Sequence, residues 1–566
     1  MTMVDFNPGL IMVLGGLLVP LLSSSVRRVV LLALPIAGLT YVISLQVGTT
    51  VTADFMGYTL EVLRVDKLTL LWGYVFHIAA FLGVLYAIHE DDPVQAAMAQ
   101  IYMGSAVAAV FAGDLITLFI FWELTAISSV FLIWASGTER SFHAGMRYLV
   151  VQIGSGVLLL AGAVIIFAET GSIHFGHIGV ETFGGKLVLV AFGIKCAFPL
   201  LHNWLQDAYP EATVSGTVIL SAFTTKLAVY ALARGFAGTE FLIYIGATMT
   251  AFPIFFAVIE NNLRRVLAYS LNNQLGFMVV GIGVGTELAI NGAAGHAFAH
   301  IIYKALLFMT MGAVLMRTGT INGSDLGGLY KTMPWTTGFC IIGAASISSF
   351  PLMSGFVTKS MILTALGVEG YWFIWAILLF ASAGVFHHSG IKIPYFAFFA
   401  HDSGMRPKEA PFNMRFSMGI AAFLCIAVGV YPAPLYAILP FDVDYIPYSP
   451  AHVITQLQLL MFSALAFTFL MLTGLYPPEL KSTNLDTDWF YRRLAPKFFL
   501  SITTTIQRVN QRGRRILVGT FDTIIRLLDR YSSMQVVFIW INSASTMVFC
   551  ALVLLCFFLI LFLTSI

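Results

Sequence analysis

Residues 296–308 read HAFAHIIYKALLF, and they lie inside an apolar run that extends from residue 290 to residue 316. A run of this length can cross a bilayer as a helix, since about 20 mostly apolar residues suffice. His296, His300 and Lys304 are spaced by four residues, so all three share one face of that helix. A charge at the bilayer centre costs about 2.5–3.5 kcal/mol on insertion scales and needs a partner, water or a function. The stretch therefore predicts a spanning helix that carries ionisable groups inside the membrane.

The composition extends this interpretation to the whole chain. Of its 566 residues, 58% are hydrophobic and 10% are charged, against roughly 25% charge in soluble globular chains. A soluble protein of this size could not bury so much apolar surface, so the sequence predicts a polytopic membrane protein. A net charge of +2 argues against a nucleic-acid binder that relies on bulk electrostatics. The five cysteines form no CxxC pair, which argues against a disulfide framework or a cysteine metal cluster.

The apolar runs predict sixteen spans. No basic stretch precedes the first run, so we expect it to be a retained span rather than a cleaved signal peptide. The thirteenth run is too long for one straight helix, and we expect a break near residues 387–390. The sixteen are 9–22, 29–46, 68–88, 95–112, 114–135, 147–168, 187–205, 214–234, 240–259, 267–285, 290–316, 333–350, 360–400, 415–432, 453–476 and 536–563.

The distribution of basic residues supports this topology. Of the 30 lysines and arginines, 21 fall on one side of the predicted membrane and four fall inside spans. The positive-inside rule places the side with 21 in the cytoplasm and both termini outside it. The remaining five lie on the opposite side: Arg64, Lys67, Lys186, Arg234 and Lys359.

The charges inside the spans are unbalanced. They are one acid and four bases: Glu123, Lys195, Lys226, Lys304 and Lys392. Structural ion pairs alone do not explain the set, because one carboxylate cannot neutralise four ammonium groups. Lys195 and Lys226 lie on spans joined by a short loop and can approach each other, and Glu123 can pair with either.

The two histidines beside Lys304 could instead be metal ligands. A third ligand and a supporting carboxylate are absent nearby in the sequence, so we predict neither a metal nor another cofactor. A row of groups that exchange protons through water fits His296, His300 and Lys304 better.

Two similar triplets predict helix breaks beside these charges. Phe198-Pro199-Leu200 follows Lys195, and Phe350-Pro351-Leu352 precedes Gly355. Proline removes a backbone donor and frees carbonyl groups of the preceding turn. The spans that carry the triplets run in opposite directions in the predicted topology, and broken helices in two oppositely oriented halves are typical of inverted-repeat transporters.

Four motifs stand out along the chain: FIFWELTAISSVFLI (119–133), IKCAFPLLHNWLQDAYPEAT (194–213), RRVLAYSLNNQLGFM (264–278) and HAFAHIIYKALLF (296–308). Together they resemble the antiporter-like subunits shared by respiratory complex I and multisubunit Mrp-type cation/proton antiporters, over roughly residues 65–430. A further stretch, SAFTTKLAVYALARG (221–235), looks most like the D-type branch of the Mrp antiporter subunits.

The resemblance implies the fold and the roles of the buried charges. We expect fourteen core spans with two inverted repeats of five helices, broken helices, and a hydrated chain of buried Glu, Lys and His. By motif match, Glu123 is the partner of Lys195 and Lys226 is a bridging lysine. The same match makes Lys304, with His296 and His300, the relay of the second half and Lys392 the exit-side lysine.

The expected fold is therefore an all-α polytopic membrane protein of about sixteen helices with a C-terminal amphipathic helix and a final span. The expected regions are 1–90 (N-terminal spans), 91–236 (first repeat), 237–405 (second repeat), 406–476 (flanking spans), 477–535 (amphipathic segment at the cytoplasmic face) and 536–566 (last span).

The segment 477–535 alternates apolar and basic residues. It is expected either to lie on anionic lipid as a basic amphipathic helix or to run along the membrane side of neighbouring spans or subunits. It carries no candidate proton carrier on a spanning helix. We therefore expect truncation before Leu480 to weaken assembly and to leave the axis from Glu123 to Lys392 intact.

These features favour an ion-translocating subunit of an Mrp-type cation (Na⁺ or K⁺)/H⁺ antiporter in the bacterial inner membrane, with other antiporter subunits as partners. The alternative is a proton-pumping subunit of a redox-driven complex of the complex I type. An assembly subunit without transport would not need four buried lysines. The sequence contains no Walker loop, dinucleotide fingerprint or nucleophile motif that would indicate an enzyme.

Overall fold

The computed structural model describes residues 5–55, 57–482 and 484–531, so the predicted last span at 536–563 lies outside the described residues. The contacts divide the chain into two units, one that ends at Asn484 and one that begins at Leu485. Ten helices among the described residues are long and apolar enough to cross a membrane, and three shorter apolar helices accompany them. The predicted helical, multi-pass membrane fold is thus confirmed, while the total of sixteen spans stays a prediction.

The N-terminal elements precede the region that holds the buried charges. Helices α1 (Gly9–Leu18), α2 (Ser24–Ser44) and α3 (Lys67–Ala87) flank the strands β1 (Thr50–Phe55) and β2 (Tyr58–Arg64). The strands pair antiparallel in a two-stranded sheet, with Val51 opposite Leu63. The all-α prediction is therefore wrong for this connection, where Thr and Val favour strands but the runs are too short to stand out beside the apolar spans.

Two successive groups of helices follow. The first comprises α4 (Pro93–Val110), α5 (Leu115–Trp134), α6 (Glu139–Thr170), α7 (Phe183–Lys195), α8 (Asn203–Ala208), α9 (Val214–Ala222) and α10 (Thr224–Gly235). The second comprises α11 (Phe241–Ile259), α12 (Leu263–Val284), α13 (Glu287–Thr318), α14 (Pro334–Ile347), α15 (Ser354–Val368) and α16 (Trp372–Val385), which continues into π-helical turns at Phe386–Lys392 and Tyr395–Phe399.

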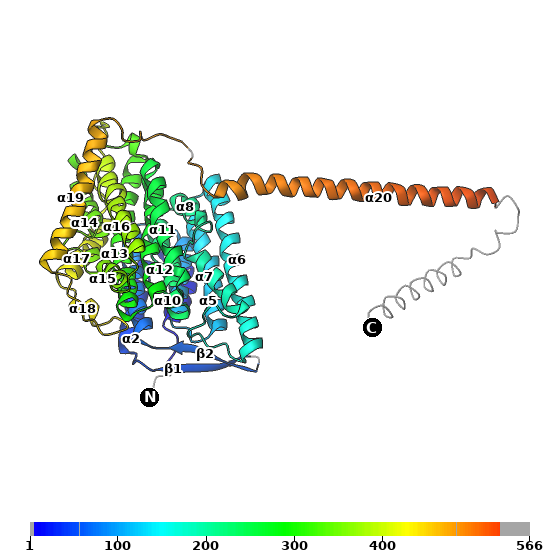
Figure 1. Ribbon diagram of the computed structural model, residues 1–566, viewed down its shortest axis with the longest axis horizontal. Coiled ribbons are helices and arrows are strands. Elements are labelled where there is room, and N and C mark those ends of the chain that lie inside the picture. The colour runs from blue at the N-terminus through cyan, green and yellow to red at the C-terminus, as the bar shows by residue number, and fades with distance from the viewer. Residues whose placement is uncertain (1–4, 56, 483, 532–566) are drawn as a thin grey trace. The chain divides into compact units, whose positions relative to one another are not determined.

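The remaining helices are α17 (Phe412–Val430), α18 (Ala433–Tyr436) and α19 (Pro450–Leu472) in the first unit, and α20 (Ala495–Tyr531) in the second. Figure 1 shows the helices of the first unit packed side by side, with the β1–β2 hairpin across one end. Helix α13 lies at the core, because every residue from Ala289 to Val314 is buried. A helix that is apolar all round is stable only when it is surrounded by other elements or by lipid.

The two groups of helices repeat several local features. Helices α6 and α13 are both 32 residues long, and each ends at a glycine with positive φ, Gly171 and Gly319. Asp114 caps α5 and Asn262 caps α12 through side-chain oxygens that accept two backbone N–H groups. Such caps stabilise a helix by about 1 kcal/mol. The beginnings of α5 and α12 are therefore alike, and so are the ends of α6 and α13.

The interruptions after α7 and α14 match as well. Ala197 and Leu200 adopt φ of 61° and 71° in the first, and Ser349 and Leu352 adopt 56° and 71° in the second. A non-glycine residue with such a φ costs of order 1–3 kcal/mol and persists where the surrounding structure imposes it. Pro199 lies within the first interruption. Pro351 lies in the second, just before the start of α15.

Two helix interruptions differ from the sequence-based expectations. The predicted span 360–400 is two helices, α15 and α16, which divide at residues 369–371. The expected break at residues 387–390 is wrong, since the helix widens there into a π-helical turn and continues. The predicted span 214–234 is divided at Phe223 into α9 and α10.

Candidate functional site

The first lysine predicted inside a span, Lys195, lies at the contact between α5 and α7. Lys195 is the last residue of α7 and is fully buried. Its Nζ donates to the Trp122 carbonyl oxygen at 2.5 Å and to Thr125 Oγ1 at 2.8 Å, both on α5. The ammonium also lies 4.3 Å from the centroid of the Trp122 ring, within range of a cation–π interaction.

Glu123 lies beside this lysine without contacting it. Its Oε1 is buried and accepts no hydrogen bond from the described residues. The carboxylate interacts electrostatically with Lys195. It occupies space left by Gly156 of α6, where a Cβ atom would stand 1.4 Å from Oε1. Glycine at this position therefore allows a carboxylate to sit between α5 and α6.

Lys226 is placed by the interruption between α9 and α10. Its Nζ donates to the carbonyl oxygen of Ser221 in the last turn of α9. Tyr102 stabilises the start of α10, because its hydroxyl accepts a hydrogen bond from the Thr224 backbone N–H at 3.0 Å. The helix break thus supplies a free carbonyl to a fully buried lysine.

The three groups predicted on one face of α13 are all fully buried. His296 is held by Thr358 Oγ1 and Gln274 Oε1, each 3.1 Å from one ring nitrogen. His300 and Lys304 have no hydrogen-bond partner among the described residues. A buried ammonium without a protein partner is costly. The charge on Lys304 is therefore sensitive to charges placed nearby.

A lysine that the sequence analysis assigned to an outer loop also lies here. Lys359 is 2% exposed within α15, and its Nζ is 4.3 Å from the centroid of the Phe277 ring. The assignment was wrong because α15 begins at Ser354, earlier than the predicted span at 360–400. Gly355, predicted to accompany a break, lies in the first turn of α15, where a Cβ would stand 2.0 Å from the Ser346 carbonyl oxygen.

Lys392 lies in the π-helical turn after α16 and is fully buried. Its Nζ forms an ion pair of 2.8 Å with Glu479, from the loop after α19. The segment from 477 onward thus contacts the axis at this residue, a contact that the sequence did not predict. Sequence reasoning missed Glu479 because it lies outside every predicted span.

His388 is a fully buried residue in the π-helical turn after α16. The Nδ1 atom of His388 is 2.8 Å from Ser389 Oγ, which in turn donates to Ser270 Oγ at 2.7 Å. His388 interacts electrostatically with both Lys304 and Lys392. In the sequence analysis the two adjacent histidines at 387–388 were used only to predict a helix break, and neither was predicted to be part of a proton pathway.

The buried basic groups from Lys226 to Lys392 form one electrostatically connected series. Lys226 acts on both His300 and Lys304, and Lys304 acts on His388. His388 interacts with Lys392, which contacts Glu479. Moving a proton onto or off one member therefore changes the energy of the charge on the next. We refer to Glu123, Lys195, Lys226, His296, His300, Lys304, His388 and Lys392 as the buried axis.

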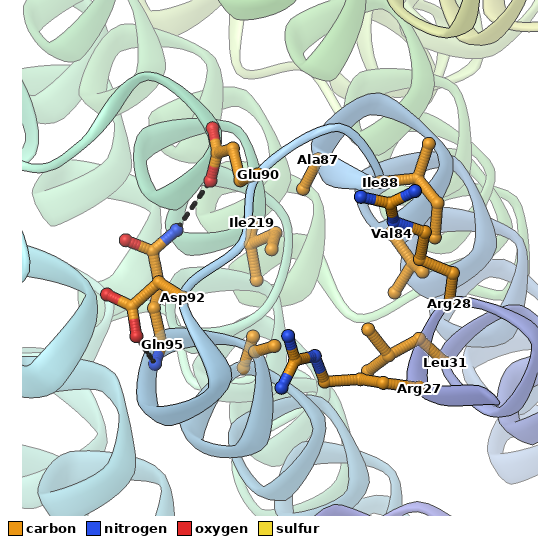
Figure 2. Close-up of a pocket in the computed structure, with 12 residues that line it drawn as sticks. Arg27, Arg28, Leu31, Val84, Ala87, Ile88, Glu90, Asp92, Gln95 and Ile219 are labelled. Atoms are coloured by element: carbon orange, nitrogen blue, oxygen red, sulfur yellow. Dashed lines mark hydrogen bonds between the residues drawn. The ribbon is translucent and has the colours of Figure 1, made fainter. Parts of the chain in front are cut away.

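A small cavity near one end of α9 lies apart from these residues. Its volume is about 40 Å³. It is lined by Arg27 and Arg28 from α2 and by Glu90 and Gln95 near the start of α4 (Figure 2). Gln95 Nε2 bonds to Glu90 Oε2 at 2.8 Å and to Ser215 Oγ at 3.0 Å. These contacts fix the beginning of α9, the helix that ends beside Lys226.

The central region of the chain is similar to known membrane proteins. Residues 112–386 match the family model described as NADH:quinone oxidoreductase/Mrp antiporter, transmembrane. The D-type Na⁺/H⁺ antiporter subunit of Alkalihalophilus pseudofirmus is 33% identical over 284 residues, which cover 46% of this chain and 57% of that protein. The N-type NADH-quinone oxidoreductase subunit of Desulforudis audaxviator is 32% identical, and the match covers 48% of this chain and 58% of that protein. The chain therefore aligns with somewhat more than half the length of these curated relatives.

Two solved structures share the fold. A chain of the Mrp complex from Dietzia sp. DQ12-45-1b matches with a TM-score of 0.68 and 21% identity, over 76% of this chain and 95% of that one. A chain of the archaeal membrane-bound sulfane sulfur reductase matches with a TM-score of 0.71 and 22% identity, over 97% of this chain and 99% of that one. Residues 112–386, which hold most of the buried axis, are thus similar to the transmembrane family that NADH:quinone oxidoreductases share with Mrp antiporters.

Proposed function

We propose that this chain is the proton-translocating subunit of a multisubunit Mrp-type monovalent cation/H⁺ antiporter. The observation that carries the proposal is the connected series of buried basic groups between Lys226 and Lys392, which accompanies the Glu123–Lys195 pair. Such groups are expensive inside a membrane and are best explained by ion movement. The names of relatives, which include a D-type Na⁺/H⁺ antiporter subunit and a probable K⁺/H⁺ antiporter subunit, support exchange of a monovalent cation.

Each residue of the axis receives a role in this proposal. Glu123 biases the charge of Lys195, Lys226 bridges the two halves, and His296, His300 and Lys304 relay protons to the exit side at Lys392. The helix breaks at Pro199 and Pro351 belong to two inverted repeats. The matching lengths of α6 and α13 and the matching positive φ angles support that arrangement.

The proposal includes a setting in the cell. The chain lies in a bacterial inner membrane with both termini outside the cytoplasm, supported by the excess of basic residues on one side. Its partners are other subunits of the antiporter, and its cargo is H⁺ with Na⁺ or K⁺. The amphipathic segment with α20 lies at the cytoplasmic face.

A second candidate is a proton-pumping subunit of a redox-driven membrane complex. One observation favours it: the fold match to a chain of the sulfane sulfur reductase extends over 97% of this chain, whereas the Mrp match covers 76%. In that case redox chemistry in partner subunits drives the same axis. Purification of the native complex separates the two, because redox subunits would accompany the chain only in the second.

The direct test uses everted membrane vesicles that contain the chain with its partner subunits. After respiration has acidified the vesicle interior, addition of Na⁺ or K⁺ is expected to release protons, measured as recovery of a pH-sensitive dye. Vesicles without the chain serve as the control. Absence of cation-dependent proton release from vesicles with the assembled complex would contradict the proposal.

Truncation separates assembly from transport. A chain that ends after Asn484 is expected to form fewer complexes but to keep flux per assembled particle within about twofold of wild type. The reason is that the contacts divide at this residue and the buried axis lies wholly before it. The measurement is flux normalised to complexes recovered by purification through a partner subunit.

A shorter truncation provides the contrast. A chain that ends before Leu480 loses two contacts that hold the loop of Glu479, the Lys481–Asp325 ion pair and the hydrogen bond from Asn484 to Glu260. In place of the sequence-based expectation that this truncation leaves the axis intact, its flux per particle is expected to fall well below that of the longer truncation. Equal flux in the two would show that the contacts of Lys481 and Asn484 are not needed for transport.

A further inference from the structure

The ammonium of Lys392 has more acceptors than it has protons to donate. Its Nζ donates to the backbone carbonyl oxygens of Ala257, Val258 and Glu260 at 3.3, 2.6 and 2.7 Å. These groups lie at the C-terminal end of α11, where carbonyls are left without helical partners. A lysine has three donors, so the three carbonyls already satisfy it. The fourth acceptor, Glu479 Oε1 at 2.8 Å, is not needed to hold the lysine in place.

Lys392 is the ion-pair partner of the Glu479 carboxylate. Its side chain is 6% exposed, and neither carboxylate oxygen has a hydrogen-bond partner elsewhere among the described residues. Glu479 lies outside the membrane-spanning helices, seven residues beyond the end of α19. Burial raises the pKa of Glu479 above its ordinary value, and the neighbouring Lys392 ammonium opposes that rise. A carboxyl of this kind holds a proton more readily than an exposed one.

The loop that carries Glu479 is fixed by contacts on both sides of this residue. Tyr476 packs with Phe396 and Phe467 in a small apolar cluster. Lys481 Nζ forms an ion pair of 2.9 Å with Asp325. These contacts position the carboxylate, so its approach to Lys392 follows from the docking of the whole loop.

Glu479 also borders an open space. A cavity of about 280 Å³ is lined by Gly323, Phe396, His401, Tyr476 and Glu479. The volume is far above the 10–15 Å³ that one water needs, and Glu479 and His401 are polar residues of its lining. Both carboxylate oxygens of Glu479 are buried, so the carboxylate lies just beneath this lining. Lys392 is fully buried and does not line this cavity, so of the two residues of the ion pair only Glu479 reaches it.

We propose that Glu479 is the terminal proton carrier of the buried axis, which passes protons between Lys392 and water in this cavity. The proposal rests on the function proposed above. In the outward step of the relay, the Lys392 ammonium gives one proton to the Glu479 carboxylate, which leaves a neutral amine and a carboxylic acid. The acid then gives that proton to a cavity water and returns to carboxylate, so charge and atoms balance and no redox partner is required.

The test compares three variants of the full chain in its native complex. Glu479→Gln keeps the shape of the side chain but cannot accept a proton, and it is expected to lower cation-driven proton flux per particle by more than about tenfold. Glu479→Asp keeps a titratable group and is expected to retain flux within about threefold of wild type. Asp402→Asn removes a carboxylate from an exposed ion pair with Lys331 and is expected to leave flux unchanged. Recovery of the complex and its thermal stability are measured for each.

A second readout distinguishes a carrier from a structural partner. Infrared difference spectra of the wild-type complex across the pH range of transport should contain a protonated-carboxyl band that Glu479→Gln lacks. Equal loss of flux in Glu479→Gln and Glu479→Asp, without that band, would show that Glu479 only positions Lys392. Wild-type flux in Glu479→Gln, in a complex where Lys304→Ala abolishes flux, would overturn this proposal and leave the proposed function standing. Cation-independent behaviour of the wild-type complex would overturn both.

Discussion

Replacing Lys226 by arginine is expected to abolish cation-driven proton flux as completely as replacing it by alanine, while the complex still assembles. Lys226 is fully buried and donates to one carbonyl exposed by the break between α9 and α10. Alanine removes the carrier, and arginine keeps a charge that it cannot release. Loss of a positioned proton carrier typically costs 10²–10⁴-fold in rate, so we expect a decrease of at least about a hundredfold in both variants.

The control for this substitution is Lys331→Arg. Lys331 is half exposed and forms an ion pair with Asp402 at 2.6 Å, so the same chemical change there should leave flux unchanged. Flux is measured per assembled complex in everted vesicles. A normal rate in Lys226→Arg would mean that position 226 needs only a fixed positive charge, and that protons take another route.

Replacing Glu123 by alanine is expected to have an effect of similar size. The carboxylate acts on Lys195 through space rather than through a contact ion pair, so its removal changes the energy of the lysine charge without breaking a hydrogen bond. We expect transport to fall at least about a hundredfold and assembly to remain intact. The measurement is again flux per complex recovered.

A neighbouring substitution tests the position of the carboxylate rather than its presence. Gly156→Ala places a methyl group where Glu123 Oε1 lies, so it should impair flux although every charge remains. Gly154→Ala on the same helix has no atom within 4 Å of the added Cβ and is the matched control. Normal flux in Glu123→Ala would remove this residue from the axis.

The spanning helices could be predicted from the sequence because the length of an apolar run shows whether it can cross a bilayer as a helix. The same reasoning failed where length was misleading. The run at 360–400 hides a division at residues 369–371, where Gly370 adopts a φ of 79°. The break between α9 and α10 left no proline or glycine signal, since Phe223 interrupts the helix by its backbone conformation alone.

The charged residues inside the spans could also be predicted from the sequence, because a lysine within an apolar run is a clear exception to the composition around it. Lys359 was not predicted to lie in the membrane because it is one residue before the predicted span at 360–400. Helix α15 begins earlier, at Ser354, and therefore includes it. Glu479 escaped because nothing in its own loop indicates burial. Its contact with Lys392 joins residues 87 positions apart and exists only once the loop docks on the helices.

The central claim is that the buried axis carries protons in exchange for a monovalent cation. Its most direct test is the proton flux of everted vesicles on addition of Na⁺ or K⁺, compared between wild type and Lys304→Ala at equal amounts of assembled complex. Lys304 lies in the middle of the axis without a hydrogen-bond partner among the described residues, so its removal breaks no protein contact of that kind. The account predicts cation-dependent proton release in the wild type and its loss in the variant. Equal release in both, or none in the wild type, would contradict it.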